Sequence, residues 1–276
     1  MEVFFIFKEL LIINHSKMKK LLFLLFLPLT LSAQYAVADF IVLNKGMDSQ
    51  YHKLEKVWGA WHKNSINKGE KSGWAVWKRT ATDNDNENAA HYVVFNQFSS
   101  KEQMDNYING GGNFSINKAI SVMKSNLKGM STGTIRKIVQ SEQKIKKQVR
   151  TYHLQLLDAT PFTGGDLKIG DKMTFAPMIQ KSDDYEQVES YIAKPYFLQQ
   201  VMNGKHRWWA FTKVINRNDQ AYKEISHIAW NIFIPGAEFD DRLVENEFVQ
   251  KVLNDKMSSS REMRNVQELT LVYQSN

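Results

Sequence analysis

The chain has 276 residues, a net charge of +7 and no cysteine. The absence of cysteine excludes disulfides, thiolate metal sites and a cysteine nucleophile, and so modest a charge is not typical of a nucleic-acid-binding protein. The length suffices for one large domain or two small ones, each with its own hydrophobic core.

Residues 18–33 have the features of a secretory signal peptide. Two lysines precede an apolar stretch that ends in the small residues of 31–33. The stretch is shorter than the roughly 20 residues of a membrane span, so no stable membrane insertion is expected after cleavage; the alternative is a single membrane anchor. Residues 1–17 do not suit a signal peptide and suggest a mis-assigned start upstream of Met18. We therefore expect a periplasmic or secreted protein that begins at Gln34, with no cysteine to carry a lipid.

Beyond this leader, the hydrophobic patterns predict the order strand, helix, strand, strand, helix, strand twice. In the first half these elements are expected at 36–44, 48–67, 73–81, 90–98, 100–146 (broken by glycines) and 148–157. In the second half they are expected at 172–181, 183–202, 207–216, 225–234, 238–256 and 264–273. Turn residues crowd the join at 158–171.

The repetition is also visible residue by residue. Placing Tyr51 on Tyr185 aligns the first helix and the strand after it without a gap, and this puts Trp74 on Trp208. Pro195 interrupts the second copy of the helix and predicts a kink or break there.

The β-α-β-β-α-β order is the ferredoxin-like unit. Its antiparallel sheet carries helices on one face, so the other face needs a cover, which a second copy supplies. The predicted fold class is α+β, with two tandem ferredoxin-like repeats, 34–158 and 159–276, whose sheets face each other as an intrachain pseudo-dimeric barrel. In this order and repetition, over about 35–276, the chain resembles the dimeric α+β barrel superfamily. That superfamily includes antibiotic-biosynthesis-monooxygenase-like proteins, stress-responsive barrels and chlorite dismutases, and no catalytic residue is carried over from it.

Asn96 and Asn231 stand within apolar strands, where a buried amide needs hydrogen-bond partners. Asn96 aligns with Asn231 if the loop before this strand has one more residue in the second half than in the first. Alternation places Tyr92 on the face of Asn96, and His227 on the face of Asn231. The opposite faces are more apolar and are expected under the helices, so both asparagines are predicted to line the space between the sheets. The alternative is a structural asparagine that neighbouring backbone satisfies.

Tryptophans of the second strands add an aromatic lining to this predicted space. Successive side chains of a strand point to opposite faces, so Trp74 and Trp77 lie on different faces of one strand, and Trp208 and Trp209 on different faces of the other. One tryptophan of each pair should therefore face inward. A space of this kind is typical of an organic-ligand site. The candidate ligand-binding residues are Asn96, Asn231, Tyr92, His227, Trp77 and Trp209.

The favoured function is an exported protein that binds a small, partly aromatic ligand between its sheets, with no assigned activity and no cofactor. No histidine pair has metal-binding spacing, so no metal site is predicted. The resemblance implies two enzyme alternatives, a cofactor-independent monooxygenase-like enzyme and a haem-dependent one. A filled space between the sheets would instead favour a structural or assembly protein without a pocket. No nucleic-acid partner is expected, and homo-oligomers are compatible with the sequence.

Overall fold

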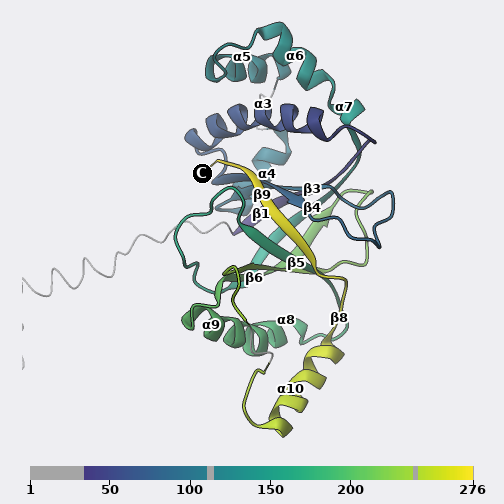
Figure 1. Cartoon of the computed structure of the whole chain (residues 1–276), viewed down its shortest axis with the longest axis vertical. Helices are drawn as coiled ribbons and strands as arrows, with labels where there is room; N and C mark the ends of the chain where they lie inside the picture. The colour runs from purple at the N-terminus through teal and green to yellow at the C-terminus, as the bar shows by residue number, and fades with distance from the viewer. Residues whose placement is uncertain (1–33, 111–114, 239–241, 276) are drawn as a thin grey trace, which may run out of the picture. The chain divides into compact units, whose positions relative to one another are not determined.

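The computed structural model describes residues 34–110, 115–238 and 242–275 (Figure 1). The predicted signal segment lies outside these residues, and export therefore stays a prediction. None of the helices in the described part of the chain has both the length and the apolar composition needed to cross a membrane.

The first half follows the predicted order. Its elements are β1 (Tyr35–Leu43), α3 (Asp48–Asn67), β2 (Gly73–Arg79), β3 (Tyr92–Phe98), α4 (Lys101–Ile108), α5 (Ile116–Asn126), α6 (Thr132–Gln140), α7 (Glu142–Ile145) and β4 (Lys146–Ala159). The helical region before β4 is broken, as expected. Helices α4, α5 and α6 each begin after a serine, Ser100, Ser115 or Ser131, whose hydroxyl accepts a first-turn N–H.

The second half repeats this order with a distorted first helix. Its elements are β5 (Lys172–Gln180), α8 (Tyr185–Val188), η2 (Glu189–Ala193), α9 (Lys194–Met202), β6 (His206–Arg217), β7 (His227–Phe233), α10 (Glu247–Ser260), β8 (Arg261–Met263) and β9 (Gln267–Ser275). The break predicted at Pro195 is confirmed: the π-helical turn η2 precedes it, and the proline lies in the first turn of α9, where its missing N–H costs nothing. Helix α10 begins after its N-cap Asn246, later than the predicted start at 238.

Eight strands of the described residues form one closed antiparallel barrel in the order β7-β6-β4-β1-β3-β2-β9-β5, and β5 pairs back with β7. The first half contributes the sheet β4-β1-β3-β2 and the second the matching sheet β9-β5-β7-β6. Strand pairs β2–β9 and β4–β6 join them. The predicted pseudo-dimeric barrel of two ferredoxin-like repeats is confirmed. Helices α3 to α7 lie on one side of the barrel, and α8 to α10 lie on the opposite side (Figure 1).

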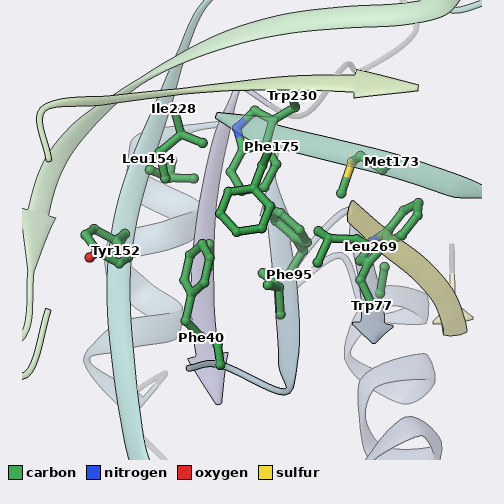
Figure 2. Packing of buried hydrophobic residues seen from close by; sticks show 14 of the residues in the cluster. Phe40, Trp77, Phe95, Tyr152, Leu154, Met173, Phe175, Ile228, Trp230 and Leu269 are labelled. Atoms are coloured by element: carbon green, nitrogen blue, oxygen red, sulfur yellow. The ribbon is translucent and has the colours of Figure 1, made fainter. Parts of the chain in front are cut away.

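Aromatic and aliphatic side chains from both halves fill the barrel interior (Figure 2). Phe95 and Trp230 meet edge to face with ring centroids 4.8 Å apart, and Phe40 and Phe175 do so at 5.3 Å. These pairs join one sheet to the other within the main hydrophobic core. Core side chains therefore occupy the space between the sheets in which the sequence predicted a ligand site.

Asn96 and Asn231 occupy equivalent places, as predicted, but they face the helices. Asn96 pairs with Trp74 across β2 and β3, and Asn231 pairs with Trp209 across β6 and β7. Both tryptophans belong to clusters that pack beneath the helices. The sequence analysis expected the more apolar face of each strand to pack against the helices. In this barrel the interior excludes polar groups more completely than the helix layer does, so the more apolar face is the inner one.

Trp209, and not Trp208, is the counterpart of Trp74. A β-bulge between His206 and Trp208 holds the extra residue that the alignment had placed in the following loop. Trp209 consequently lies under the helices, and its predicted position between the sheets is wrong. Trp77 faces the barrel interior, as predicted, together with Trp208.

Candidate functional site

A cavity of about 980 Å³ lies in the first half, between helices α3 and α4 and the outer face of strands β1 and β3. Trp58 and Trp61 of α3 supply an aromatic wall. Asp39 and Asn96 supply polar groups from the sheet, and Tyr107 of α4 borders the same space. The site therefore combines an aromatic wall with many polar and charged side chains, and so offers an organic molecule both a stacking surface and hydrogen-bonding groups.

Helix α3 borders this cavity because it packs against two other layers at once. Tyr51 and Leu54 pack on the sheet, whereas Val57 packs against α5 and α6. A helix held on two sides has a broad apolar surface, and Glu55 lies within it. The Glu55 side chain lines the cavity, and the residue is only 3% exposed.

Two buried carboxyl groups face the cavity. Burial raises the pKa of Glu55 to about 7, against the opposing effect of the Lys146 charge. Burial also raises the pKa of Asp39, which accepts a hydrogen bond from Thr151 Oγ1 at 2.5 Å. Burial lowers the pKa of Lys146, but the carboxylates of Glu55 and Glu142 outweigh it and raise that pKa overall. Glu55 is thus able to give or take a proton near neutral pH.

Beneath the cavity, the ammonium group of Lys71 lies between His62 and Asn96. Its Nζ is 2.5 Å from His62 Nδ1, 2.5 Å from Asn96 Oδ1 and 4.9 Å from the centre of the Tyr107 ring. Lys71 is 1% exposed, and burial lowers its pKa to about 7. Burial and the Lys71 charge hold the pKa of His62 well below its usual range. His62 is therefore a neutral imidazole at physiological pH.

The turn that ends α3 positions Lys71. Gly69 has a φ of 70°, in the left-handed region that favours glycine. The backbone N–H of Glu70 then bonds to the carbonyl of Ser65 on the last turn of the helix. The chain reverses at once, so Lys71 lies under the helix just before β2 begins.

Tyr92 and His227 lie away from this cavity. The Tyr92 hydroxyl donates to Asp48 Oδ1 at 2.6 Å and lies 2.9 Å from His52 Nε2, near the start of α3. His227 Nε2 lies 3.4 Å from Glu186 Oε1 in the second half. Both side chains are held in local polar contacts beneath their helices.

The structure does not gather the sequence-predicted residues in one place. Asn231 and Trp209 lie under α9, where the Phe197 ring stacks on Trp209 at 5.5 Å. Trp77 lies inside the barrel. Of the six predicted residues, all of them in the described part of the chain, Asn96 alone lines the cavity. The ligand-binding role of the other five stays a prediction.

Sequence reasoning missed Glu55, although a signal for it was present. The alignment that pairs Tyr51 with Tyr185 also pairs Glu55 with Glu189, and both glutamates are buried. A glutamate at the same place in two apolar helix surfaces is unusual, because carboxylates are seldom fully buried unless they are paired. Lys71 had no such signal, because a lysine in a turn after a helix is common.

No protein-family model matches the chain, and no curated protein matches it. Solved structures do match. An anthrone oxidase-like protein has a TM-score of 0.50 and 10% identity, covering 88% of this chain and 93% of its own. A proposed monooxygenase from Lactobacillus acidophilus has a TM-score of 0.50 and 12% identity, covering 88% and 95%. Another from Fusobacterium nucleatum subsp. nucleatum has a TM-score of 0.51 and 8% identity, covering 88% and 93%. At these identities the likeness shows the fold alone, a tandem α+β barrel.

Proposed function

We propose that the protein binds a small aromatic molecule in the cavity between α3 and the sheet. The cavity carries this proposal: its volume of about 980 Å³ and its Trp58 and Trp61 wall suit a flat organic molecule. The polar side chains of His62 and Asn96 at its base supply the few oriented groups that such a site needs. The proposed site lies on the opposite face of the sheet from the one that the sequence suggested.

Equilibrium dialysis against 4-nitroanisole, a neutral aromatic probe, tests this proposal. Trp58→Leu removes one aromatic wall and should weaken binding by about tenfold, the scale of one stacking contact. Phe197→Leu makes a matching change in the helix layer of the second half and should bind as the wild type does. Failure of the wild type to bind the probe, or an equal loss in both variants, would show that the cavity is not the site.

Glu55 favours a second candidate, an enzyme that removes a proton from an enolisable aromatic substrate and lets O₂ oxidise it. A general base works best with a pKa near the working pH, and burial raises the pKa of Glu55 to about 7. Proteins of the same fold carry the descriptions anthrone oxidase-like and monooxygenase. For anthrone, Glu55 would accept a proton from the ring carbon, and the carbanion would react with O₂ to give anthraquinone and water.

Oxygen uptake with anthrone, in buffer without added cofactor, tests this candidate. The wild type should consume O₂ and form anthraquinone, and Glu55→Gln should lose nearly all of the rate because it removes the base. Trp58→Leu should retain turnover with a raised KM. If wild type and Glu55→Gln take up O₂ at the same rate, Glu55 is not the base and the catalytic candidate is refuted. The binding proposal would be unaffected.

Haem does not fit the histidine that lines this cavity. A metal-ligating histidine normally donates its other ring N–H to an acceptor. Lys71 Nζ lies 2.5 Å from His62 Nδ1, and in its ammonium form it donates to that nitrogen, which is the reverse arrangement. The proposal therefore involves no haem at this site, and a purified protein without a Soret band is the expected result.

A further inference from the structure

Lys71 controls which atoms of His62 and Asn96 are left for a ligand. An ammonium group has three N–H donors and no acceptor. Burial lowers the pKa of Lys71 to about 7, and in the ammonium form its contacts with His62 Nδ1 and Asn96 Oδ1, each at 2.5 Å, make both of those atoms acceptors. The Tyr107 hydroxyl adds a second donor to Asn96 Oδ1, at 3.3 Å.

The ring proton of neutral His62 must then be on Nε2, and the NH₂ group of Asn96 is its remaining polar group. Both residues line the cavity. The polar base of the cavity thus presents two kinds of donor, the imidazole Nε2–H and the amide Nδ2–H, while the acceptors of the same side chains are already used. A ligand atom that meets this base must be an acceptor.

The charge of Lys71 adds an independent observation. Lys71 is 1% exposed and makes no ion pair with the described residues; burial lowers its pKa by more than the charges of Glu70, Asp39 and Glu55 raise it. A buried charge without a counter-ion is costly. An anion bound above His62 and Asn96 would add a nearer counter-charge to the ammonium form of Lys71.

We infer that this base is a binding subsite for a phenolate or enolate oxygen of the aromatic ligand, and that Lys71 is the positioning residue that gives the subsite its donor character. The inference rests on the proposed function, because it names the ligand class of the same cavity. His62 and Asn96 would contact the oxygen, and Lys71 would act through them. An oxyanion in this place is also the form that a substrate takes after a base has removed its proton.

Other charged groups face the same cavity and set the background against which the oxyanion ionises. The carboxyl groups of Asp39 and Glu55 oppose an anion when they are ionised, which burial disfavours. The remaining charged residues that line the cavity are Glu70, Lys118, Glu142 and Lys146. None of these residues is replaced in the variants below, and the neutral probe 4-nitroanisole shows whether a variant still binds an aromatic ring.

Absorbance titration of bound 4-nitrophenol tests the inference, because its phenolate has a distinct absorption band. On wild type the pH midpoint of ionisation should fall by about one unit relative to the free phenol, the scale of one charge-assisted hydrogen bond. Lys71→Met should abolish that shift. Asn96→Asp should also abolish it: it keeps a partner for Lys71, so the fold is retained, but it replaces the amide donor with a carboxylate. Asn231→Asp makes the same change in the second half and should keep the shift.

The outcomes separate the two proposals. If 4-nitrophenol and 4-nitroanisole both bind and the midpoint is unshifted or raised, the oxyanion subsite is refuted and the aromatic site survives. If the midpoint falls but Lys71→Met and Asn96→Asp leave the shift intact, the assignment to Lys71 is refuted. If neither probe binds the wild type, the proposed function fails and the subsite fails with it.

Discussion

Glu55 and Glu189 occupy equivalent helix positions in different surroundings. Glu189 is 2% exposed, and its Oε1 lies 2.9 Å from Nη1 of Arg261. Burial raises the pKa of Glu189, and Arg261 opposes the rise. Glu55 borders the cavity, and in the described part of the chain no cation lies within ion-pair distance of it. The same residue is thus ion-paired in one half and, in the other, a buried carboxyl group that makes no ion pair with the described residues and whose pKa is raised to about 7.

The unpaired state of Glu55 predicts a pH-dependent stability. Its pKa is about 7 in the folded protein and 4.5 ordinarily, so the folded protein binds more protons between these values. The stability that this group contributes is fully present below pH 4.5 and is lost as the pH rises through 7. Glu55→Gln removes the titration. Relative to wild type, the free energy of unfolding of this variant should therefore rise by about 3 kcal/mol between pH 4.5 and pH 8, measured by urea unfolding.

Glu189→Gln is the matched control for this measurement. It breaks a buried ion pair, so it should destabilise the protein by about 3–5 kcal/mol; because the pKa of Glu189 is also raised, this cost should fall as the pH rises, whereas Glu55→Gln makes no such loss of an ion pair. A Glu55→Gln difference that does not change with pH would mean that the pKa of Glu55 is not raised, and would remove the main support for its role as a base.

At the scale of the elements, local patterns predicted most of the secondary structure. The helical spacing of apolar residues over 48–67 coincides with α3, because a helix with a buried face shows its period within one segment. The break before α9 was predictable from Pro195 for the same reason, since the steric effect of proline is local. The N-terminal end of α10 was not, because the residues 238–246 carry an apolar pattern but the cap is at Asn246.

The faces of β3 and β7 could not be predicted from these patterns. Alternation separates the two faces of a strand but does not tell which one faces the barrel interior, because closure depends on strands far apart in the sequence. Both faces of β3 are largely buried. The hydrogen bond from Lys71 to Asn96 identifies the face of β3 that lies under α3. No local sequence pattern predicts that a lysine lies there.

At the scale of the whole molecule, the two halves share one hydrophobic core. Phe40 and Phe95 come from the first half, and Phe175 and Trp230 from the second, and their rings are in contact inside the barrel (Figure 2). The pairs β2–β9 and β4–β6 also cross between the halves. The cavity that we propose as the site lies outside this core. The sheet forms one of its walls, and helices α3 and α4 form further walls.

The shared core predicts that neither half folds alone as a stable monomer. A separate 34–158 or 159–276 fragment would expose the inner face of its sheet and two unpaired edge strands, which favours self-association or unfolding. Mixed fragments should instead form a one-to-one complex with the circular dichroism spectrum of the intact chain, detected by native mass spectrometry. Trp230→Ala in the second fragment should weaken that complex, because the loss of a large core aromatic costs about 3–5 kcal/mol. Asn231→Leu, on the helix-facing side of the same strand, should weaken it far less. A soluble, cooperatively unfolding monomer of either fragment would show that each sheet is stable without the other, and the interior contacts would then serve the assembly of the halves rather than their folding.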